Sequence, residues 1–208
     1  MKLLYGTGNK SKLRTMRDHV APLGIELTGL DSITMPLPEI DESGTNPLEN
    51  ARIKAMAYYA TLKTPVFSCD SGMYINGLPP ARQPGVHVRR VNGCRLTDDE
   101  MIAHYSAIAA EFGGYVTAQY RNAICLVLSE TEIYEHDGDD IASEKFLIAA
   151  KPHRKRSEGF PIDSLSVHID SGRYYYDLGN YREKYFGVAG GFEAFFRRGM
   201  GLDNISAQ

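Results

Sequence analysis

The sequence predicts an α/β fold, and three observations support this class. A short apolar segment, Lys2–Tyr5, is followed by a glycine-rich turn and then by apolar residues at helical spacing, which indicates a strand, a turn and a helix. A second apolar run ends at Val66-Phe67 and leads into an acid, Asp70. Further strand-like segments between residues 115 and 149 suggest a second lobe.

Length and composition are those of a globular protein that buries a substantial core. The 208 residues are 43% apolar and 24% charged, and the formal net charge is -3. This charge offers no overall field for a polyanion, so we expect no nucleic-acid polymer as a partner. No stretch reaches the roughly 20 apolar residues of a membrane span, and the N-terminus lacks a signal-peptide pattern. We therefore expect a cytoplasmic protein without membrane association.

The cysteines and histidines show no metal-ligand pattern. Cys69, Cys94 and Cys125 are odd in number and lack Cys-x-x-Cys spacing, which argues against a disulfide framework and a zinc site. The six histidines likewise lack ligand spacing. We expect reduced, mostly buried thiols.

The first turn, Gly6 to Lys12, is a candidate anion site. Such a turn leaves N–H groups unpaired at the start of a helix, and with the helix dipole they favour an anion by ~0.3 to 1 kcal/mol per charge. Lys12 adds a positive charge one turn into the helix. The segment matches neither common phosphate-binding glycine motif, so an ordinary turn with a solvated lysine remains an alternative.

A second helix is predicted to begin at Asn46, with this residue as N-cap and Pro47 at the first helical position. Lys54 shares one face of this helix with two alanines. A buried ammonium needs an anionic partner; otherwise the side chain extends its charge to the surface. The preceding acids, Glu39, Asp41 and Glu42, form either a solvated loop or a site for a hard cation.

Asp70 is the first candidate for a catalytic or metal-binding group. If Val66-Phe67 is the end of a buried strand, Asp70 falls just beyond the carboxyl end, where open α/β sheets place their ligands. The alternative is an aspartate that only shapes a turn by accepting backbone N–H groups.

The middle of the chain adds a helix and several strands. Thr97, with Glu100 three residues later, predicts a capping box and a helix to Phe112. Strands are expected at Tyr115–Leu128, Glu132–Tyr134 and Lys145–Ala149, with an acidic turn, Glu135–Asp140, between the last two.

Two later segments have competing interpretations. The basic run Lys151–Arg156 is most simply a solvated loop connecting the lobes, with contact to a triphosphate or binding of nucleic acid as alternatives. The tyrosines at 174 to 176 are expected in a strand core or a dimer contact, although they could stack a base.

Four motifs follow one another over residues 1 to 95. They are Thr7-Gly8-Asn9-x-x-Lys12; Glu42-x-Gly44 leading to Glu49-Asn50-Ala51-x-x-Lys54-Ala55; Asp70-Ser71-Gly72; and Pro84-Gly85-Val86 with Arg90 and Gly93. In this order the sequence resembles the inosine triphosphate pyrophosphatase family, which hydrolyses non-standard purine nucleoside triphosphates such as ITP, dITP and XTP to the monophosphate and pyrophosphate.

The resemblance implies an elongated, two-lobed α/β domain over residues 1–208, with a central mixed sheet flanked by helices and an active-site cleft between the lobes. It also implies a homodimer that uses Mg²⁺. An acid of the Asp41-Glu42 pair, together with Asp70, would hold the metal, and Asp70 would be the base for the attacking water. The residues implied in substrate binding are Thr7, Gly8, Asn9, Lys12, Lys54, Ser71, Gly72 and Arg90.

The chain departs from the family pattern in its C-terminal half. Gly159-Phe160-Pro161-Ile162-Asp163-Ser164 replaces the usual Gly-Phe-Gly-Tyr-Asp-Pro, and Cys69 replaces the first of two acids before Ser-Gly. The family's Ser-His-Arg, which helps to recognise the base, is absent, and Gly187–Phe192 stands in its place.

The base must then be recognised by other groups. Phe160 offers a face for stacking and Asp163 an acceptor, but a 6-oxo purine also needs a donor. The expected donors are a backbone N–H of Gly187–Gly191, Lys184, Arg197 or Arg198.

These observations lead to the hypothesis of a magnesium-dependent nucleoside triphosphate pyrophosphatase acting on non-standard purine nucleotides. One alternative is a nucleotide-binding sensor or scaffold that has lost turnover. Another is a hydrolase of a different modified or pyrimidine nucleotide.

Overall fold

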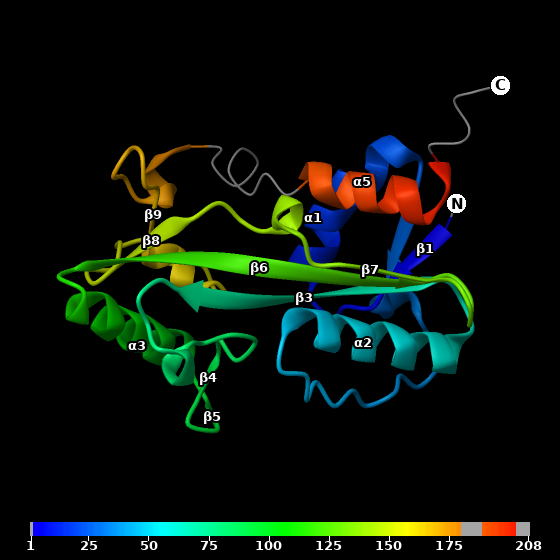
Figure 1. The fold of residues 1–208 in the computed structure, drawn as a ribbon, viewed down its shortest axis with the longest axis horizontal. Helices are drawn as coiled ribbons and strands as arrows, with labels where there is room; N and C mark the ends of the chain where they lie inside the picture. The colour runs from blue at the N-terminus through cyan, green and yellow to red at the C-terminus, as the bar shows by residue number, and fades with distance from the viewer. Residues whose placement is uncertain (1, 180–188, 203–208) are drawn as a thin grey trace. The chain divides into compact units, whose positions relative to one another are not determined.

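The computed structural model describes residues 2–179 and 189–202 (Figure 1). The chain divides into two compact units. Unit 1 contains the described residues of Met1–Ser71, Arg121–Ala142 and Val188–Gln208, and unit 2 contains those of Gly72–Tyr120 and Ser143–Gly187. No helix in these described ranges is long and apolar enough to cross a membrane.

The central sheet is mixed. Its strands are β1 (Lys2–Tyr5), β2 (Glu26–Gly29), β3 (Val66–Ile75), β6 (Tyr115–Val127), β7 (Ile133–His136), β8 (Phe146–Ala149) and β9 (Ser166–Val167). They run in the order β2-β1-β3-β6-β8-β9, with β7 paired to β6. β1 pairs with β2 and β3 in parallel, whereas β6 pairs with β7 and β8 antiparallel.

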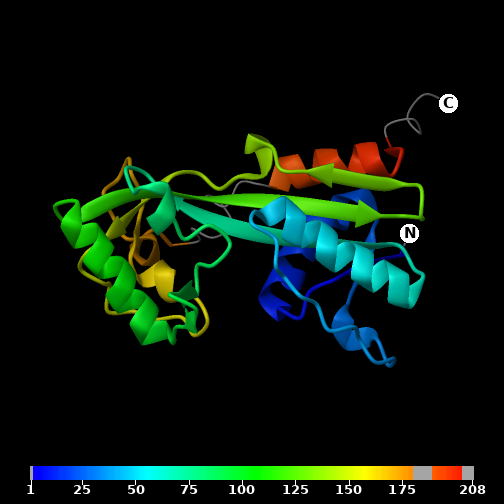
Figure 2. The same ribbon diagram turned by 60° about the horizontal axis from the view of Figure 1, so that its bottom comes forward.

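Within the described residues, four helices accompany the sheet. They are α1 (Lys10–Val20), α2 (Pro47–Leu62), α3 (Asp98–Glu111) and α5 (Ala189–Gly199). Short 3₁₀ turns lie at η1 (Ala21–Leu23), η2 (Leu30–Ser32), η3 (Pro80–Arg82), η4 (Asp139–Ile141), η5 (Pro161–Ser164) and η6 (Tyr175–Asp177), and β4 (Arg90–Val91) pairs with β5 (Cys94–Arg95) as a small hairpin. In unit 1, α2 covers one face of the sheet while α1 and α5 cover the other (Figures 1 and 2). The predicted mixed α/β sheet flanked by helices is confirmed.

The two faces of unit 1 explain the direction of each side chain on β3. Phe67 and Cys69 belong to the core shared with α1 and α5, whereas Val66 belongs to the core shared with α2. Because successive residues of a strand point to opposite faces, Ser68 and Asp70 lie on the α2 side with Val66. The parity of the strand therefore directs Asp70 toward α2.

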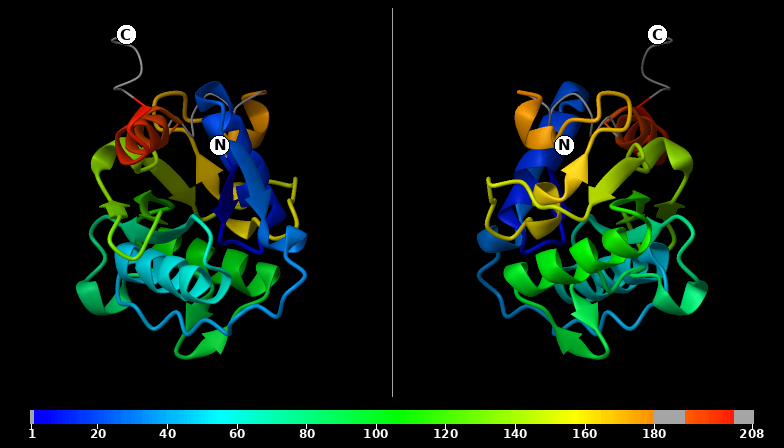
Figure 3. Two further views of the ribbon diagram at one scale, coloured as in Figure 1. Left: turned by 90° about the vertical axis from the view of Figure 1, so that its right-hand side faces the viewer. Right: turned by 90° about the vertical axis from the view of Figure 1, so that its left-hand side faces the viewer.

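Unit 2 packs α3 on a core of its own. The buried apolar side chains of this core come from the end of β3, from α3, from β6 and β8, and from η5 and η6; α3 appears in green in Figure 3. The predicted capping box at its start is confirmed, since Thr97 Oγ1 accepts the Glu100 N–H at 3.3 Å and Glu100 Oε2 accepts the Thr97 N–H at 2.8 Å.

The expected end of the third strand at Phe67 is wrong. β3 continues to Ile75, so Asp70 lies within the strand rather than just beyond it. The continuation has non-local partners: Met73 and Gly85 exchange backbone hydrogen bonds of 2.9 and 3.0 Å, and the Gln83 side chain bonds both the N–H and the C=O of Ile75. Local sequence pattern does not reveal these partners.

Two smaller expectations also change. The tyrosines at 174 to 176 are not strand residues: Tyr174 makes an isolated bridge to Val167, and η6 begins at Tyr175, which is buried in the core of unit 2. The acidic turn starts later than expected, because β7 extends to His136.

The thiols behave as expected. Cys69 and Cys125 are buried, Cys94 is exposed, and none forms a disulfide. Burial raises the pKa of the Cys69 and Cys125 thiols to about 12.

The first turn of α5 yields a test of packing. An added Cβ at Gly191 would lie 2.6 Å from the carbonyl carbon of Asp140 in η4, whereas one at Gly190 would meet nothing within 4 Å. Gly191→Ala should lower the free energy of unfolding by about 1 to 3 kcal/mol through overpacking. Gly190→Ala is the matched control and should be neutral or stabilising by up to about 1 kcal/mol. Denaturant unfolding measures both; equal effects would contradict this packing.

Candidate active site

The glycine-rich turn leads from β1 into α1 as predicted. Asn9 Oδ1 accepts the Lys12 N–H at 3.1 Å, which is the N-cap interaction of α1, and Thr7 Oγ1 accepts the Asn9 N–H at 3.2 Å. The Thr7 and Asn9 side chains thus fix the turn itself. Lys12 is exposed on the first turn of the helix.

The turn is anchored to β3 through Gly6. The Gly6 N–H donates to Phe67 O at 2.8 Å, and Ser68 Oγ donates to Gly6 O at 3.2 Å. A Cβ on Gly6 would lie 2.6 Å from the Tyr58 ring and would also overlap Ser68 Oγ. Glycine is therefore required for the close approach of the turn to β3, on the same face that carries Asp70.

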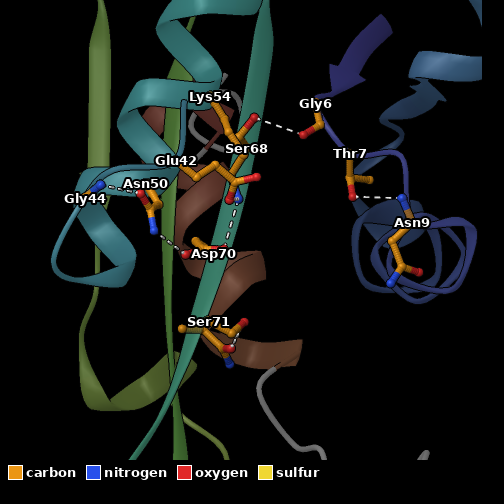
Figure 4. Close-up of polar contacts among 11 residues, drawn as sticks. Gly6, Thr7, Asn9, Glu42, Gly44, Asn50, Lys54, Ser68, Asp70 and Ser71 are labelled. Atoms are coloured by element: carbon orange, nitrogen blue, oxygen red, sulfur yellow. Dashed lines mark hydrogen bonds and ion pairs between the residues drawn. The ribbon is translucent and has the colours of Figure 1, made fainter. Parts of the chain in front are cut away.

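Lys54, on α2, is the centre of a charged cluster in unit 1. Its Nζ lies 2.9 Å from Asp70 Oδ1 and 2.9 Å from Glu42 Oε2 (Figure 4). The Lys54 side chain is only 12% exposed and that of Asp70 14%. Burial by itself lowers the pKa of Lys54, but the charges and hydrogen bonds of Asp70 and Glu42 outweigh burial and raise it above its usual value.

Asn50 connects the cluster to the loop before α2. This residue is 2% exposed; its Nδ2 donates to Asp70 Oδ2 at 3.2 Å, and its Oδ1 accepts the Gly44 N–H at 2.9 Å. The helix itself starts as predicted, because Asn46 Oδ1 accepts the Glu49 N–H at 3.0 Å and Pro47 occupies the first helical position. One helix start thus places both Asn50 and Lys54 opposite Asp70.

The predicted metal ligands divide into two groups. Glu42 and Asp70 share the Lys54 ammonium, whereas the Asp41 side chain is exposed and makes no ion pair with any described residue. Within residues 2–179 and 189–202, no three His, Cys, Asp or Glu side chains gather as a metal-binding group. The geometry offers two carboxylates, not three, to a cation.

Ser71 and Gly72 lie at the point where β3 passes from unit 1 to unit 2. Ser71 Oγ donates to Asn122 Oδ1 of β6 at 2.7 Å, within unit 1. An added Cβ at Gly72 would lie 3.1 Å from the backbone of Gly85, so this glycine allows the Pro84-Gly85 segment to approach β3. These contacts support the strand.

The residues predicted to recognise the base belong to both units. Arg90 is exposed on β4, while half-buried Phe160 and Asp163 lie at η5; all three belong to unit 2. Arg197 pairs with Glu193 one turn earlier on α5 at 2.8 Å, and Arg198 is exposed. Gly191 packs against η4, and Lys184 and Gly187 lie outside the described residues.

A pocket of about 280 Å³ adjoins the glycine-rich turn within unit 1. Its lining residues are Thr7, Gly8, Lys10, Leu13, Leu30, Asp31 and Leu37. Three leucines make much of its wall, and Lys10 and Asp31 provide opposite charges.

Sequence reasoning missed two polar residues that position the cluster and its strand. The motif that contains Asn50 gives this residue no role of its own, but a buried asparagine on an alanine-rich helix face indicates a fixed hydrogen-bond partner. Asn122 directly precedes the apolar run Ala123–Val127, and its side chain bonds both Ser71 and the carbonyl of Ile141.

The fold and this site together define a class: an α/β protein with a glycine-rich turn after β1 and a lysine paired to one carboxylate on β3 and one in the loop before α2. The profile of the Ham1 family matches residues 3–142. The chain therefore belongs to the Ham1 family, which confirms the resemblance drawn from the four motifs. The match ends at Ala142, so it includes Cys69 but not the segments Gly159–Ser164 and Gly187–Phe192, in which the sequence also departs from the family pattern.

Curated relatives carry a common name. A protein of Rhodopseudomonas palustris named dITP/XTP pyrophosphatase is 33% identical over 138 residues, covering 64% of this chain and 64% of that protein. A Bradyrhizobium diazoefficiens protein of the same name is 37% identical over 138 residues, with the same two coverages. The matched part of the chain thus spans less than two thirds of the length of these relatives.

Solved structures agree on the fold. A HAM1 protein from Coxiella burnetii superposes with a TM-score of 0.73 at 22% identity, covering 98% of this chain and 99% of that one. A structure from Mycobacterium abscessus, described as a nucleoside-triphosphatase or dITP/XTP pyrophosphatase, gives a TM-score of 0.65 at 24% identity and covers both chains in full. These likenesses confirm the fold class predicted from the sequence.

The buried Asn50 yields a prediction about the cluster. Asn50→Asp keeps the acceptor for Gly44 but places a carboxylate oxygen against Asp70 Oδ2, so the free energy of unfolding should fall by about 1 to 3 kcal/mol at pH 7. At pH 4 this loss in the free energy of unfolding should be smaller, because a proton shared between the two carboxyl groups removes their repulsion. Denaturant unfolding at the two pH values measures this.

Asn50→Ala provides the comparison for this experiment. It leaves the Gly44 N–H without its acceptor and Asp70 Oδ2 without its donor but introduces no charge, so its loss of stability should change less between the two pH values than that of Asn50→Asp. An Asn50→Asp deficit that does not change with pH would contradict the contact with Asp70.

Proposed function

We propose that the chain is a nucleoside triphosphate pyrophosphatase that hydrolyses non-standard purine nucleotides such as ITP, dITP and XTP to the monophosphate and pyrophosphate. The observation that carries this proposal is the Lys54 ammonium held between Asp70 and Glu42, on the face of β3 to which the glycine-rich turn is anchored. Membership of the Ham1 family and the names of the relatives support the same activity.

Lys54 retains a donor for a phosphate. An ammonium group has three N–H donors, and Asp70 and Glu42 take two of them. In the proposal the third donor binds the triphosphate, with Lys12 and the N-terminal N–H groups of α1 as further contacts. The Thr7 and Asn9 side chains hold the turn in the shape that these contacts require.

Magnesium is part of the proposal, and the donor set fits it. Mg²⁺ is usually held by one or two carboxylates while substrate phosphates and water supply its other ligands. Glu42 and Asp70 both contact the Lys54 ammonium in this structure, and in the proposal they would hold Mg²⁺. Asp41, beside Glu42, is the other candidate ligand. Bound Mg²⁺ would offset negative charge on the phosphates as the bond to the leaving group breaks.

In the proposed reaction each residue of the site has a separate role. Asp70 takes a proton from water, whose oxygen then forms a bond to the α-phosphorus. The bond from that phosphorus to the bridging oxygen breaks, and pyrophosphate leaves. Lys12 and Lys54 stabilise the charge that develops on the phosphates. Asn50 keeps the Asp70 carboxylate in place through its 3.2 Å hydrogen bond.

Recognition of the base is the other part of this proposal. In the proposal Phe160 stacks on the purine, Asp163 accepts a hydrogen bond from it, and Arg90 contacts the substrate. The donor that would read a 6-oxo group is proposed among Lys184, Arg197, Arg198 and the N–H groups of Gly187–Gly191. The single two-lobed domain and the homodimer implied by the resemblance, and the cytoplasmic location expected from the sequence, remain parts of this proposal.

A panel assay tests the proposal against its alternatives. ITP, dITP, XTP and the standard triphosphates are incubated with Mg²⁺, and pyrophosphate and orthophosphate are measured separately. We expect pyrophosphate from ITP, dITP and XTP, and a roughly 5- to 150-fold preference in kcat/KM for ITP over ATP. Binding without turnover favours a sensor, and turnover of a different nucleotide favours another hydrolase.

Asp70→Asn tests the catalytic acid. The change preserves size and most hydrogen bonding but removes the charge, so turnover of ITP should fall about 100-fold or more. Asp18→Asn, on the exposed side of α1, is the control and should turn over normally. Near-normal turnover in folded Asp70→Asn would remove this residue from the mechanism.

Lys12→Ala and Lys54→Ala test the phosphate contacts. Each should weaken binding of ITP far more than binding of inosine, and added salt should narrow the difference more for exposed Lys12 than for largely buried Lys54, because salt screens exposed charges more strongly. Titration calorimetry measures both ligands. Lys2→Ala, which removes an exposed lysine paired to Glu26, is the control. Equal losses for ITP and inosine would show that the lysines act on stability or on the base.

A further inference from the structure

An ion pair in unit 2 connects three segments that are separate in the sequence. Arg89 Nη1 lies 2.7 Å from Asp98 Oδ1, at the start of α3. The other carboxylate oxygen, Asp98 Oδ2, accepts the Gly159 N–H at 2.8 Å, and Arg89 Nη2 donates to Gly159 O at 3.4 Å. Arg89 and Asp98 thus bind both backbone groups of one glycine.

The glycine they bind occupies a special position. Gly159 has a φ of +77°, a conformation that side-chain-bearing residues rarely adopt, and it directly precedes Phe160. Phe160 then leads into η5, where the Asp163 N–H donates to Phe160 O at 3.2 Å. Gly159 thus stands at the start of the turn that carries both Phe160 and Asp163.

The Arg89 end of the ion pair is held equally well. Arg89 O accepts the Leu96 N–H at 2.9 Å across the hairpin, and Tyr105 of α3 donates its hydroxyl to Val88 O at 2.8 Å. Arg90, the next residue, is exposed at the start of β4. The backbone on both sides of Arg89 is fixed, so its guanidinium can set the position of Gly159.

Hydrogen bonds from Arg89 and from the Gly159 N–H also lower the pKa of Asp98, so its carboxylate is charged at neutral pH. A guanidinium and a carboxylate that each use more than one atom form a geometrically specific pair. Such a pair fixes an orientation more strictly than a single contact between two exposed charges.

We propose that Arg89 and Asp98 are positioning residues for the base end of the substrate: they hold the Gly159 turn so that Phe160 and Asp163 meet the purine. This inference rests on the proposed function. It concerns discrimination among bases, and neither residue touches the reacting phosphates.

The test compares Arg89→Ala, Asp98→Ala and the double variant by steady-state kinetics with ITP and ATP. Each single variant should raise KM for ITP about tenfold, the effect of one hydrogen bond to a charged group, while kcat changes less than about threefold. The preference for ITP over ATP should fall. The double variant should resemble either single variant, because both act through one turn.

The control is a second pair between an arginine and a carboxylate of α3. Arg82 donates to Glu111 at 2.8 and 2.9 Å, at the opposite end of α3 and without contact to Gly159. Arg82→Ala should leave KM and base preference unchanged. Arg89→Lys keeps the charge but lacks the planar guanidinium, so it should recover only part of the ITP affinity lost in Arg89→Ala. It also provides a second variant if Arg89→Ala does not fold.

Two further measurements do not require turnover. Amide hydrogen exchange at Gly159 should accelerate in Arg89→Ala and Asp98→Ala but not in Arg82→Ala, and the affinity for inosine should fall about tenfold in the same two variants. Absence of ITP turnover in the intact protein would reject the proposed function alone. Unchanged inosine affinity in both variants, or no inosine binding by the intact protein, would overturn the positioning role.

Discussion

The Lys54 ammonium between Asp70 and Glu42 is the interaction on which the rest of the site depends. A largely buried cation is stable only with anionic partners, and each carboxylate in turn needs a positive or hydrogen-bonding neighbour. The alternation of β3 sends Asp70 toward α2, the Asn46 cap fixes where α2 begins, and Asn50 holds the remaining oxygen of Asp70. The alternation of β3, the start of α2 and the pairing of charges therefore all place these side chains together in unit 1.

Local chemistry in the sequence predicts local structure well here. The Asn46-Pro47 start of α2 and the Thr97 capping box are determined by residues at most three positions apart, and both are confirmed. The alanines around Lys54 indicate either a buried ammonium with an anionic partner or a side chain that extends to the surface, and the structure shows the first. What the pattern left open was which acid would meet the lysine, because Glu42 and Asp70 reach it through tertiary packing.

The sequence predictions are wrong or incomplete where tertiary contacts, and not the local pattern, determine the structure. The strand containing Asp70 runs on to Ile75 because Met73 pairs with Gly85 and the Gln83 side chain bonds the Ile75 backbone, and none of these contacts leaves a local signal. The ion pair of Arg89 with Asp98 was missed for the same reason, since its importance lies in its contact with Gly159, 61 positions beyond Asp98. The family match ends at residue 142, so Gly159 and its contacts lie outside it.

In the proposed reaction, water attacks the α-phosphorus of a nucleoside triphosphate at Asp70. Hydrolysis of ITP with Mg²⁺ in ¹⁸O-labelled water, followed by mass spectrometry of both products, identifies the phosphorus that is attacked. We expect one ¹⁸O atom in the monophosphate and none in the pyrophosphate. Label in pyrophosphate, or release of labelled orthophosphate, would mean that a different phosphorus is attacked and would contradict the assignment.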